Sequence, residues 1–502
     1  MNAGGRDGER WVLPELGRRR FLIGAAAAAA AITTGCASDG SDGSAPTGGT
    51  STTLAPVDAA AAARPEGLDD PVFTLGVASG DPTPEAVILW TRLAPDPVAD
   101  DGLGGMPADD VEVAWDLALD EGFEQLVRSE TVTATAADGH AIHVDATGLA
   151  PATTYWYRFR LGDETSTVGR TQTLPDGSPD RFALAVVNCQ MMETGYYAAY
   201  RHLQDEEVDL VVHLGDYIYE YAGGTAGFDP EQRRSAPDRG LVSLADFRIR
   251  YASYKLDEDL AGAHARFPFV ATWDDHEVVN NYMGDTAPGD ATVQRVQERK
   301  AAAYRAWWEH LPVRLDPPVG SDLAVYRGFD IGDLARLVVL DERQDADEPP
   351  CRDEIDIPGL DYGNCDAVEG EDRTRLGPEQ EAWLADQLET STATWNLIGN
   401  PVVLAGVDGG TDESAYYLDT WDGFPQARRR LIAQLAEVDN PVVLTGDYHA
   451  GMTLEVRAEP FDQSSKLVAP EFMSPPISSQ LFPADVSART PQLLEQLNAH
   501  GY

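Results

Sequence analysis

The sequence predicts a protein of two domains, an all-β sandwich followed by an α/β domain whose central mixed sheets are flanked by helices. Residues 71–176 consist of short alternating or β-branched runs separated by turn residues, which is typical of a sandwich. From residue 177 to residue 502, largely apolar runs alternate with helical patterns, as in a sheet covered on both faces. At 502 residues the chain is long enough for more than one folded unit.

The first 36 residues have the pattern of an export signal. Arg18, Arg19 and Arg20 precede Phe-Leu and an alanine-rich apolar run over residues 23–32. The paired arginines resemble a twin-arginine signal, so we expect the twin-arginine export machinery to be a partner. Thr-Thr-Gly-Cys, ending at Cys36, resembles a lipobox. We expect Cys36 to be lipidated, which would place the protein at the cell surface or in the periplasm, anchored to the outer face of the cytoplasmic membrane. The alternative is an ordinary cleaved signal with an incidental cysteine.

A linker and the sandwich strands follow. Residues 37–70 are mostly small or polar, which predicts a flexible tether. The Leu-x-Pro-x-Thr-x-Tyr pattern from Leu149 to Tyr155 resembles the late strands of a fibronectin type III module, and this resemblance suggests the subtype of the sandwich. The predicted strands are residues 73–79, 86–93, 111–119, 129–137, 140–149, 154–162 and 166–174.

The α/β domain is predicted from longer apolar runs. Strands are expected at residues 182–187, 209–214, 269–273, 337–340, 395–398 and 442–445, and helices at 291–311, 377–390 and 424–438. Cys351 and Cys365 bracket a polar loop in a protein expected to meet oxidising conditions. A disulfide between them would stabilise the fold by roughly 3 kcal/mol.

The net charge limits the class of partner. The chain has 37 Lys and Arg against 84 Asp and Glu, a formal net charge of −47. Nucleic-acid binding needs clustered basic residues, so this composition argues against a nucleic-acid partner. A solvated acidic surface that aids solubility is the simplest interpretation.

Four short blocks place metal-binding residue types where predicted strands end. They are VVNCQ (186–190), HLGDYIYE (213–220), TWDDHEVVNN (272–281) and LTGDYHA (444–450). Side chains just past the ends of several strands are how an α/β sheet builds a site at its carboxyl edge. Oxygen donors dominate, which favours a hard divalent or trivalent ion over a closed structural zinc site. Each residue alone has an ordinary structural explanation, as a helix cap or a core side chain, but the four blocks together predict a metal enzyme.

These blocks, together with FTLGVASGDPTPEAVILWTRL and GNPVV, resemble the PhoD-like alkaline phosphatases, calcineurin-like metallophosphoesterases with an N-terminal fibronectin-like domain. The resemblance runs from Phe73 to about Ser479. It implies that one iron(III) ion is held by Cys189, Asp216, Tyr219 and His449. It further implies that Asp216 bridges to calcium, which Asn280 and Asp447 also bind, and that Arg92 reaches into the active site. Relatives usually continue past the point that corresponds to Tyr502. We therefore expect either a domain that is shortened at its C-terminal end or, equally, a fragmentary sequence.

The expected reaction is hydrolysis of small phosphate mono- and diesters by a metal-activated water, outside the cytoplasmic membrane and for phosphate acquisition. His276 is the candidate general acid; alternatively it orients Asp275 or Asn280 from outside the metal shell. Asp275 and Asn281 are expected outside the metal shell or as less certain site residues. Asn400 either lies outside the metal shell or is a turn residue, with the turn favoured. The competing hypotheses are a dedicated phosphodiesterase for phospholipid, teichoic-acid or nucleotide substrates, and a catalytically silent surface adhesion lipoprotein.

Overall fold

The structure is a computed structural model that describes residues 62–224, 234–288, 292–350, 362–363, 365–406 and 416–480. All of them belong to one compact unit spanning residues 55–502. The expectations for the export signal, for Cys36 and Cys351, for most of the linker and for residues 481–502 concern parts of the chain outside these ranges. Within the described ranges, no helix has both the length and the apolar character needed to cross a membrane.

The first of two six-stranded sheets combines strands of the predicted sandwich with strands of the predicted α/β domain. Its strand order is β5-β2-β1-β11-β10-β9. The strands are β1 (Val77–Gly80), β2 (Ala86–Arg92), β5 (Ala141–Thr147), β9 (Leu184–Val187), β10 (Leu210–Leu214) and β11 (Pro268–Thr272). β1 pairs in parallel with β11, so a sheet of the predicted sandwich continues directly into the predicted α/β sheet. No pattern in the sequence indicated that the two domains share a sheet.

The sandwich is completed by a second layer of strands. These are β3 (Val111–Ala118), β4 (Leu126–Ala134), β6 (Thr154–Leu161), β7 (Glu164–Thr165) and β8 (Gly169–Gln172). Apolar side chains of β3 and β6 pack against those of β1, β2 and β5 in one core. The sandwich also begins earlier than predicted. Ala62 bridges to Leu161, Arg64 pairs with Glu164 and Leu68 is buried, so the last residues assigned to the linker belong to this layer.

The second six-stranded sheet has the order β12-β13-β15-β17-β19-β18. Its strands are β12 (Arg327–Ile331), β13 (Ala335–Val339), β15 (Trp395–Asn400), β17 (Pro441–Thr445), β18 (Met452–Arg457) and β19 (Leu467–Met473). A small pair, β14 (Tyr362–Gly363) and β16 (Tyr416–Tyr417), lies outside it. Side chains of β10 and β11 share a core with those of β12, β13 and β17, so the two large sheets pack face to face.

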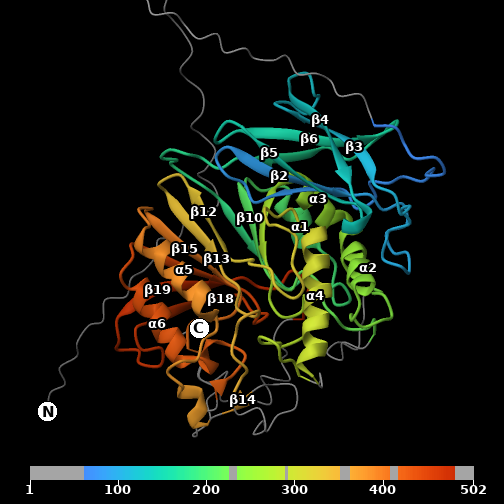
Figure 1. Cartoon of the computed structure of the whole chain (residues 1–502). Helices are drawn as coiled ribbons and strands as arrows, with labels where there is room; N and C mark the ends of the chain where they lie inside the picture. The colour runs from blue at the N-terminus through green and yellow to red at the C-terminus, as the bar shows by residue number, and fades with distance from the viewer. Residues whose placement is uncertain are drawn as a thin grey trace, which may run out of the picture. The chain divides into compact units, whose positions relative to one another are not determined.

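Helices cover the outer faces of both sheets (Figure 1). The first sheet packs against α1 (Ala198–Leu203), α2 (Leu244–Lys255), α3 (Glu258–Arg266) and α4 (Val293–His310), and the second against α5 (Gly377–Glu389) and α6 (Pro425–Leu435). Short 3₁₀ turns lie at Ala136–Asp138, Asp366–Glu369 and Trp421–Gly423. The predicted fold class is confirmed: a β-rich N-terminal region precedes a mixed α/β domain.

Candidate metal centre

The four predicted blocks follow four strands by the same short interval. β9, β10 and β11 are parallel neighbours, so their carboxyl ends meet at one edge of the first sheet. β17 brings the fourth block from the second sheet. In each case an acid or a thiol is the second residue beyond the strand: Cys189 after Val187, Asp216 after Leu214, Asp274 after Thr272 and Asp447 after Thr445. Because of this sheet topology, the residues that follow the four strand ends lie close together in one cluster.

The backbone is strained at this cluster. Cys189, Asp216, Asp447 and His449 have φ values of 52°, 57°, 59° and 52°, and Asn281 has 52°. Residues other than glycine rarely adopt this left-handed conformation, and such strain costs on the order of 1–3 kcal/mol per residue. Backbone strain concentrated on candidate ligands indicates that the loops are shaped for a site at the expense of local stability.

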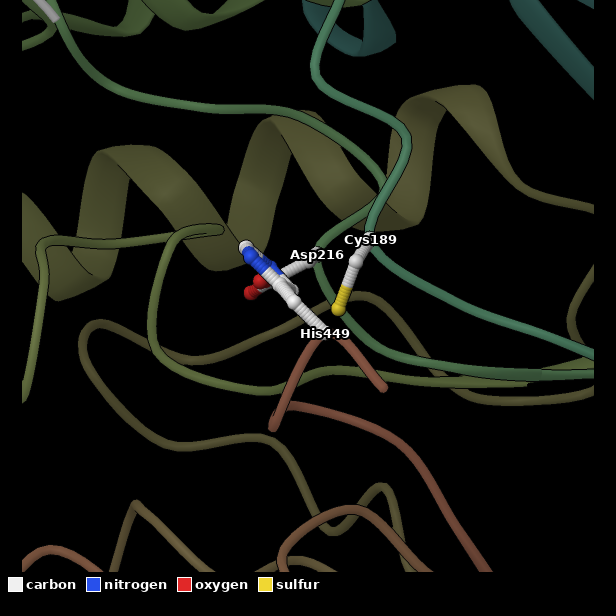
Figure 2. Close-up of side chains that lie close together, drawn as sticks. All are labelled: Cys189, Asp216 and His449. Atoms are coloured by element: carbon white, nitrogen blue, oxygen red, sulfur yellow. The ribbon is translucent and has the colours of Figure 1, made fainter. Parts of the chain in front are cut away.

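The first group of candidate ligands is Cys189, Asp216 and His449, whose donor atoms lie within 4.8 Å of one another (Figure 2). Cys189 is a free and buried cysteine. The hydroxyl of Tyr219 lies 2.8 Å from Oδ2 of Asp216 and 3.2 Å from Nε2 of His449. The structure thus brings together all four residues that the resemblance assigned to iron.

Two further groups adjoin the first. Asp216, Asp275 and His276 form one, and Asp274, Asp275 and Asp447 form the other, again with donor atoms within 4.8 Å. Asp216 links the first group to the second, as expected of a bridging carboxylate. Asp275 links the second to the third, although the sequence suggested only an outer position for it. The structure therefore gives Asp275, and Asp274 beside it, a more central place than predicted.

The three asparagines occupy different positions around the cluster. Oδ1 of Asn280 accepts a hydrogen bond from the hydroxyl of Tyr221 at 3.2 Å, and its role as a calcium ligand stays a prediction. The backbone N–H of Asn281 donates to Oδ2 of Asp275 at 2.6 Å and so orients that carboxylate. Asn400 ends β15 and is fully buried. Its Nδ2 donates to the carbonyl of Val402, while its Oδ1 has no partner in the described part of the chain, so Asn400 is more than an exposed turn residue.

Arg92 does not lie at this cluster. In the antiparallel pair of β1 and β2, Thr91 lies opposite Val77, at the start of β1. In the parallel pair of β1 and β11, the end of β1 at Gly80 lies opposite Phe269, near the start of β11. This pairing places Arg92 beyond the N-terminal end of β11, whereas the cluster follows its C-terminal end. The fully buried guanidinium of Arg92 bonds the carbonyls of Gly102 and Gly139 and the ring of His310. The structure contradicts the prediction that Arg92 reaches into the active site.

Two buried charged residues that the sequence analysis did not assign hold the cluster together. Oε2 of Glu277 accepts hydrogen bonds from the backbone N–H groups of Asp216 and Asp274, at 3.1 and 3.0 Å. Arg343 is 0% exposed and donates to Asp274 at 2.5 Å and to both oxygens of Asp419 at 2.7 and 3.0 Å. Glu277 lay inside a quoted motif, but no pattern in the sequence pointed to Arg343 or Asp419.

His276 is held by a buried carboxylate. Its Nδ1 lies 2.7 Å from Oε2 of Glu220, whose Oε1 accepts the backbone N–H of Asn280 at 2.9 Å. The imidazole packs 4.2 Å from the ring of Tyr219, measured between centroids. Burial lowers the pKa of His276, but Asp275, Glu220 and Asp216 together raise it well above its usual value. The residue is therefore oriented through one ring nitrogen and favours the protonated form.

The electrostatics of the cluster fit bound cations. Burial raises the pKa of Asp216, Asp447, Cys189 and Tyr219 well above their usual values, and that of Asp274 to about 6. Oδ2 of Asp274 and Oδ1 of Asp275 have no hydrogen-bond partner within the described ranges. Buried carboxylate oxygens without a hydrogen-bond partner are unfavourable unless they coordinate metals. A thiol, a phenol and an imidazole on one side and carboxylates on the other suit two different ions.

Cys365 is disulfide-bonded, as the sequence predicted for this residue. Its expected partner, Cys351, lies outside the described residues, so the pairing itself stays a prediction.

Comparisons with known proteins identify the family of the chain. The PhoD-like phosphatase model matches residues 184–501, and the model of the PhoD-like phosphatase N-terminal domain matches residues 59–175. Alkaline phosphatase D of Bacillus subtilis (strain 168) is 42% identical over 434 residues, which cover 85% of this chain and 73% of the relative. A solved structure of PhoD matches with a TM-score of 0.78 and 41% identity, covering 83% of this chain and 79% of that one. The chain belongs to the PhoD-like phosphatase family and is a phosphoric ester hydrolase of the alkaline phosphatase D type.

Proposed function

We propose that this phosphatase is an exported, metal-dependent enzyme that hydrolyses small phosphate mono- and diesters and serves phosphate acquisition. The observation that carries the proposal is the buried cluster around Asp216, in which three adjoining groups of candidate ligands share carboxylates. Adjoining groups with shared carboxylates are the arrangement of two-metal sites that cleave phosphate esters by in-line displacement. The relative named alkaline phosphatase D supports phosphate esters as the substrate class.

We propose that the ions are iron(III) and calcium. Cys189, Tyr219 and His449, with Asp216, would hold the iron, because a phenolate is a hard ligand and a thiolate and an imidazole complete a transition-metal set. Asp216 as the bridge, Asn280 and Asp447 would hold the calcium, and the position of Asp275 supports adding it to this shell of oxygens. Bound cations there would polarise the phosphoryl group and provide a nucleophilic water.

The chain's own residues would then orient the substrate's leaving group and supply a proton to it. Nδ1 of His276 is engaged by Glu220, which leaves Nε2 as the nitrogen that can deliver a proton to the leaving oxygen. Glu277 would keep the loops of Asp216 and Asp274 at a fixed separation, and Arg343 would hold the side chain of Asp274 in place. Fixed positioning of this kind lowers the barrier because the reacting groups need no rearrangement.

The metal content and the activity of the full chain test this proposal together. The purified protein is expected to contain both iron and calcium, to hydrolyse p-nitrophenyl phosphate and bis-p-nitrophenyl phosphate, and to lose both activities after treatment with a chelator. Adding back both ions should restore them. Protein that contains neither metal and hydrolyses both esters at full rate would contradict the metal-dependent mechanism. The ratio of the two turnover rates would measure the preference for diesters over monoesters.

The proposed export rests on the sequence of the first 36 residues. Replacement of Arg18 and Arg19 by lysine should retain the protein in the cytoplasm, because the twin-arginine machinery recognises that pair. Cys36→Ser should still be exported but should lose the lipid anchor and leave the membrane fraction. Fractionation of cells that express each variant, with immunodetection, measures both outcomes. Normal export of the double-lysine variant would contradict the twin-arginine route.

A further inference from the structure

We propose that Ser479 is a positioning residue of the metal centre: its hydroxyl donates a hydrogen bond to the phenol oxygen of Tyr219 and thereby fixes and tunes the ligand that Tyr219 offers to iron. The inference rests on the function proposed above, because it concerns Tyr219 as a ligand. Nothing in the motifs of the sequence pointed to this serine, which lies after the last strand of the second sheet.

The hydroxyl of Ser479 is held in one orientation. Its Oγ lies 2.7 Å from the phenol oxygen of Tyr219, and the backbone N–H of Met191 donates to the same Oγ at 3.1 Å. Because Oγ already accepts from Met191, its own proton is available for Tyr219. Ser479 is only 5% exposed, so water has little access to compete for this contact.

The backbone of the same segment forms hydrogen bonds with the loop that carries Cys189. The N–H of Ser479 donates to the carbonyl of Cys189 at 3.1 Å, and the N–H of Ile477 donates to the carbonyl of Asn188 at 3.0 Å. Ser479 therefore touches two candidate ligands at once, one on the loop after β9 and one on the loop after β10. It reaches them from the second sheet, through the segment that follows β19.

The remaining neighbours of the Tyr219 oxygen cannot replace this donor. They are Oδ2 of Asp216 and Nε2 of His449, which are themselves candidate ligands of the same ion. An ionised carboxylate and a metal-bound imidazole nitrogen have no proton to give. Within the described part of the chain, Ser479 is thus the donor left to a phenolate at this position. Hydrogen bonds to a metal ligand fix its orientation and tune its electron donation.

Visible absorption of the purified, iron-loaded full chain tests the inference directly. A phenolate bound to iron(III) gives a charge-transfer band, whose energy rises when a hydrogen bond withdraws electron density from the phenolate. Ser479→Ala should therefore move the band to longer wavelength and should weaken iron binding by about 10–100-fold, as measured by competition with a chelator. Circular dichroism and thermal unfolding would show that the variant is folded.

Ser478→Ala is the matched control. Its hydroxyl donates to the carbonyl of Met191 at 2.8 Å, in the same segment, but does not contact Tyr219. The band of this variant should stay at the wild-type wavelength, and Ser479→Thr, which retains a hydroxyl, should stay close to it. An unmoved band in Ser479→Ala, or an equal shift in Ser478→Ala, would overturn the inference and leave the proposed function intact. Iron-loaded wild-type protein without any such band would refute tyrosinate-bound iron itself, and this inference with it.

Discussion

Replacement of Gly215 by alanine should separate two loops that carry candidate ligands. Gly215 lies between the end of β10 and Asp216 and has φ of 98°, which alanine adopts only with strain. An added Cβ would lie 2.5 Å from Cβ of Asp274 and would also press on the backbone of that residue. To reach the 3.0–3.4 Å of tight contacts, the loops must separate by roughly 0.5–0.9 Å.

The expected effects are large for both stability and activity. Backbone strain of about 1–3 kcal/mol and overpacking of about 1–3 kcal/mol together lower the free energy of unfolding by roughly 2–6 kcal/mol. A displacement approaching 1 Å between ligand loops should lower kcat/KM on the order of 100-fold. Guanidinium unfolding followed by tryptophan fluorescence, and hydrolysis of p-nitrophenyl phosphate, measure the two effects.

Gly320→Ala separates strain from the steric clash. Gly320 also has positive φ, 65°, but nothing lies within 4 Å of its added Cβ. This control should lose only about 1–2 kcal/mol of unfolding free energy and should keep wild-type kcat/KM. If Gly215→Ala matched Gly320→Ala in both measurements, the close approach of the loops of Asp216 and Asp274 would not be required by the site, and the reasoning would be refuted.

Three further changes test the site and its surroundings. Asp216→Asn should abolish phosphatase activity while circular dichroism stays unchanged, because the shared carboxylate is lost; near-normal turnover would refute the bridging role. Arg343→Gln should lower the free energy of unfolding by about 3–5 kcal/mol, since it leaves buried carboxylates unpaired, whereas Arg201→Gln, at an exposed pair, should lower it by less than about 1 kcal/mol. Burial lowers the pKa of Lys255 to about 7, below the value of 10.5 that the residue has in the unfolded chain. Between these two pH values Lys255 is therefore protonated in the unfolded chain and neutral in the folded one. Stability should therefore rise with pH across that window by up to about 1.4 kcal/mol per pH unit, and Lys255→Met should remove this dependence; equal slopes for both proteins in urea unfolding would contradict it.

The elements that the sequence predicted are those with clear apolar periodicity or strong β propensity. The run at 86–93 became β2 at Ala86–Arg92, and the helix expected at 291–311 became α4 at Val293–His310. By contrast, α2 was not predicted, although it has 12 residues. Its residues from Phe247 to Lys255 are all buried, including two arginines and a lysine, so no polar face alternates with an apolar one.

The candidate site was predictable in its ligand types but not in its arrangement. Cys189, Asp216 and Asp447 each follow a strand by two residues, and this local signal is visible in the sequence. The central place of Asp275 was not visible, because it depends on how three loops from two sheets meet. The prediction for Arg92 was wrong because strand register, which no local pattern reveals, places it at the other end of the sheet.

The sequence by itself determined the fold class, the strand-end positions of the candidate ligands and the predominance of oxygen donors among them, since these follow from residue type and from local periodicity. Only the tertiary structure decided that the sandwich and the α/β domain share a sheet. The tertiary structure alone also shows that Arg343 pairs with Asp274 and Asp419, and that Ser479 contacts Tyr219 although 260 residues separate them in the chain. The physical reason is that hydrogen bonds and ion pairs between distant segments depend on sheet order and loop packing. Sheet order and loop packing produce no periodic pattern of residues in the sequence.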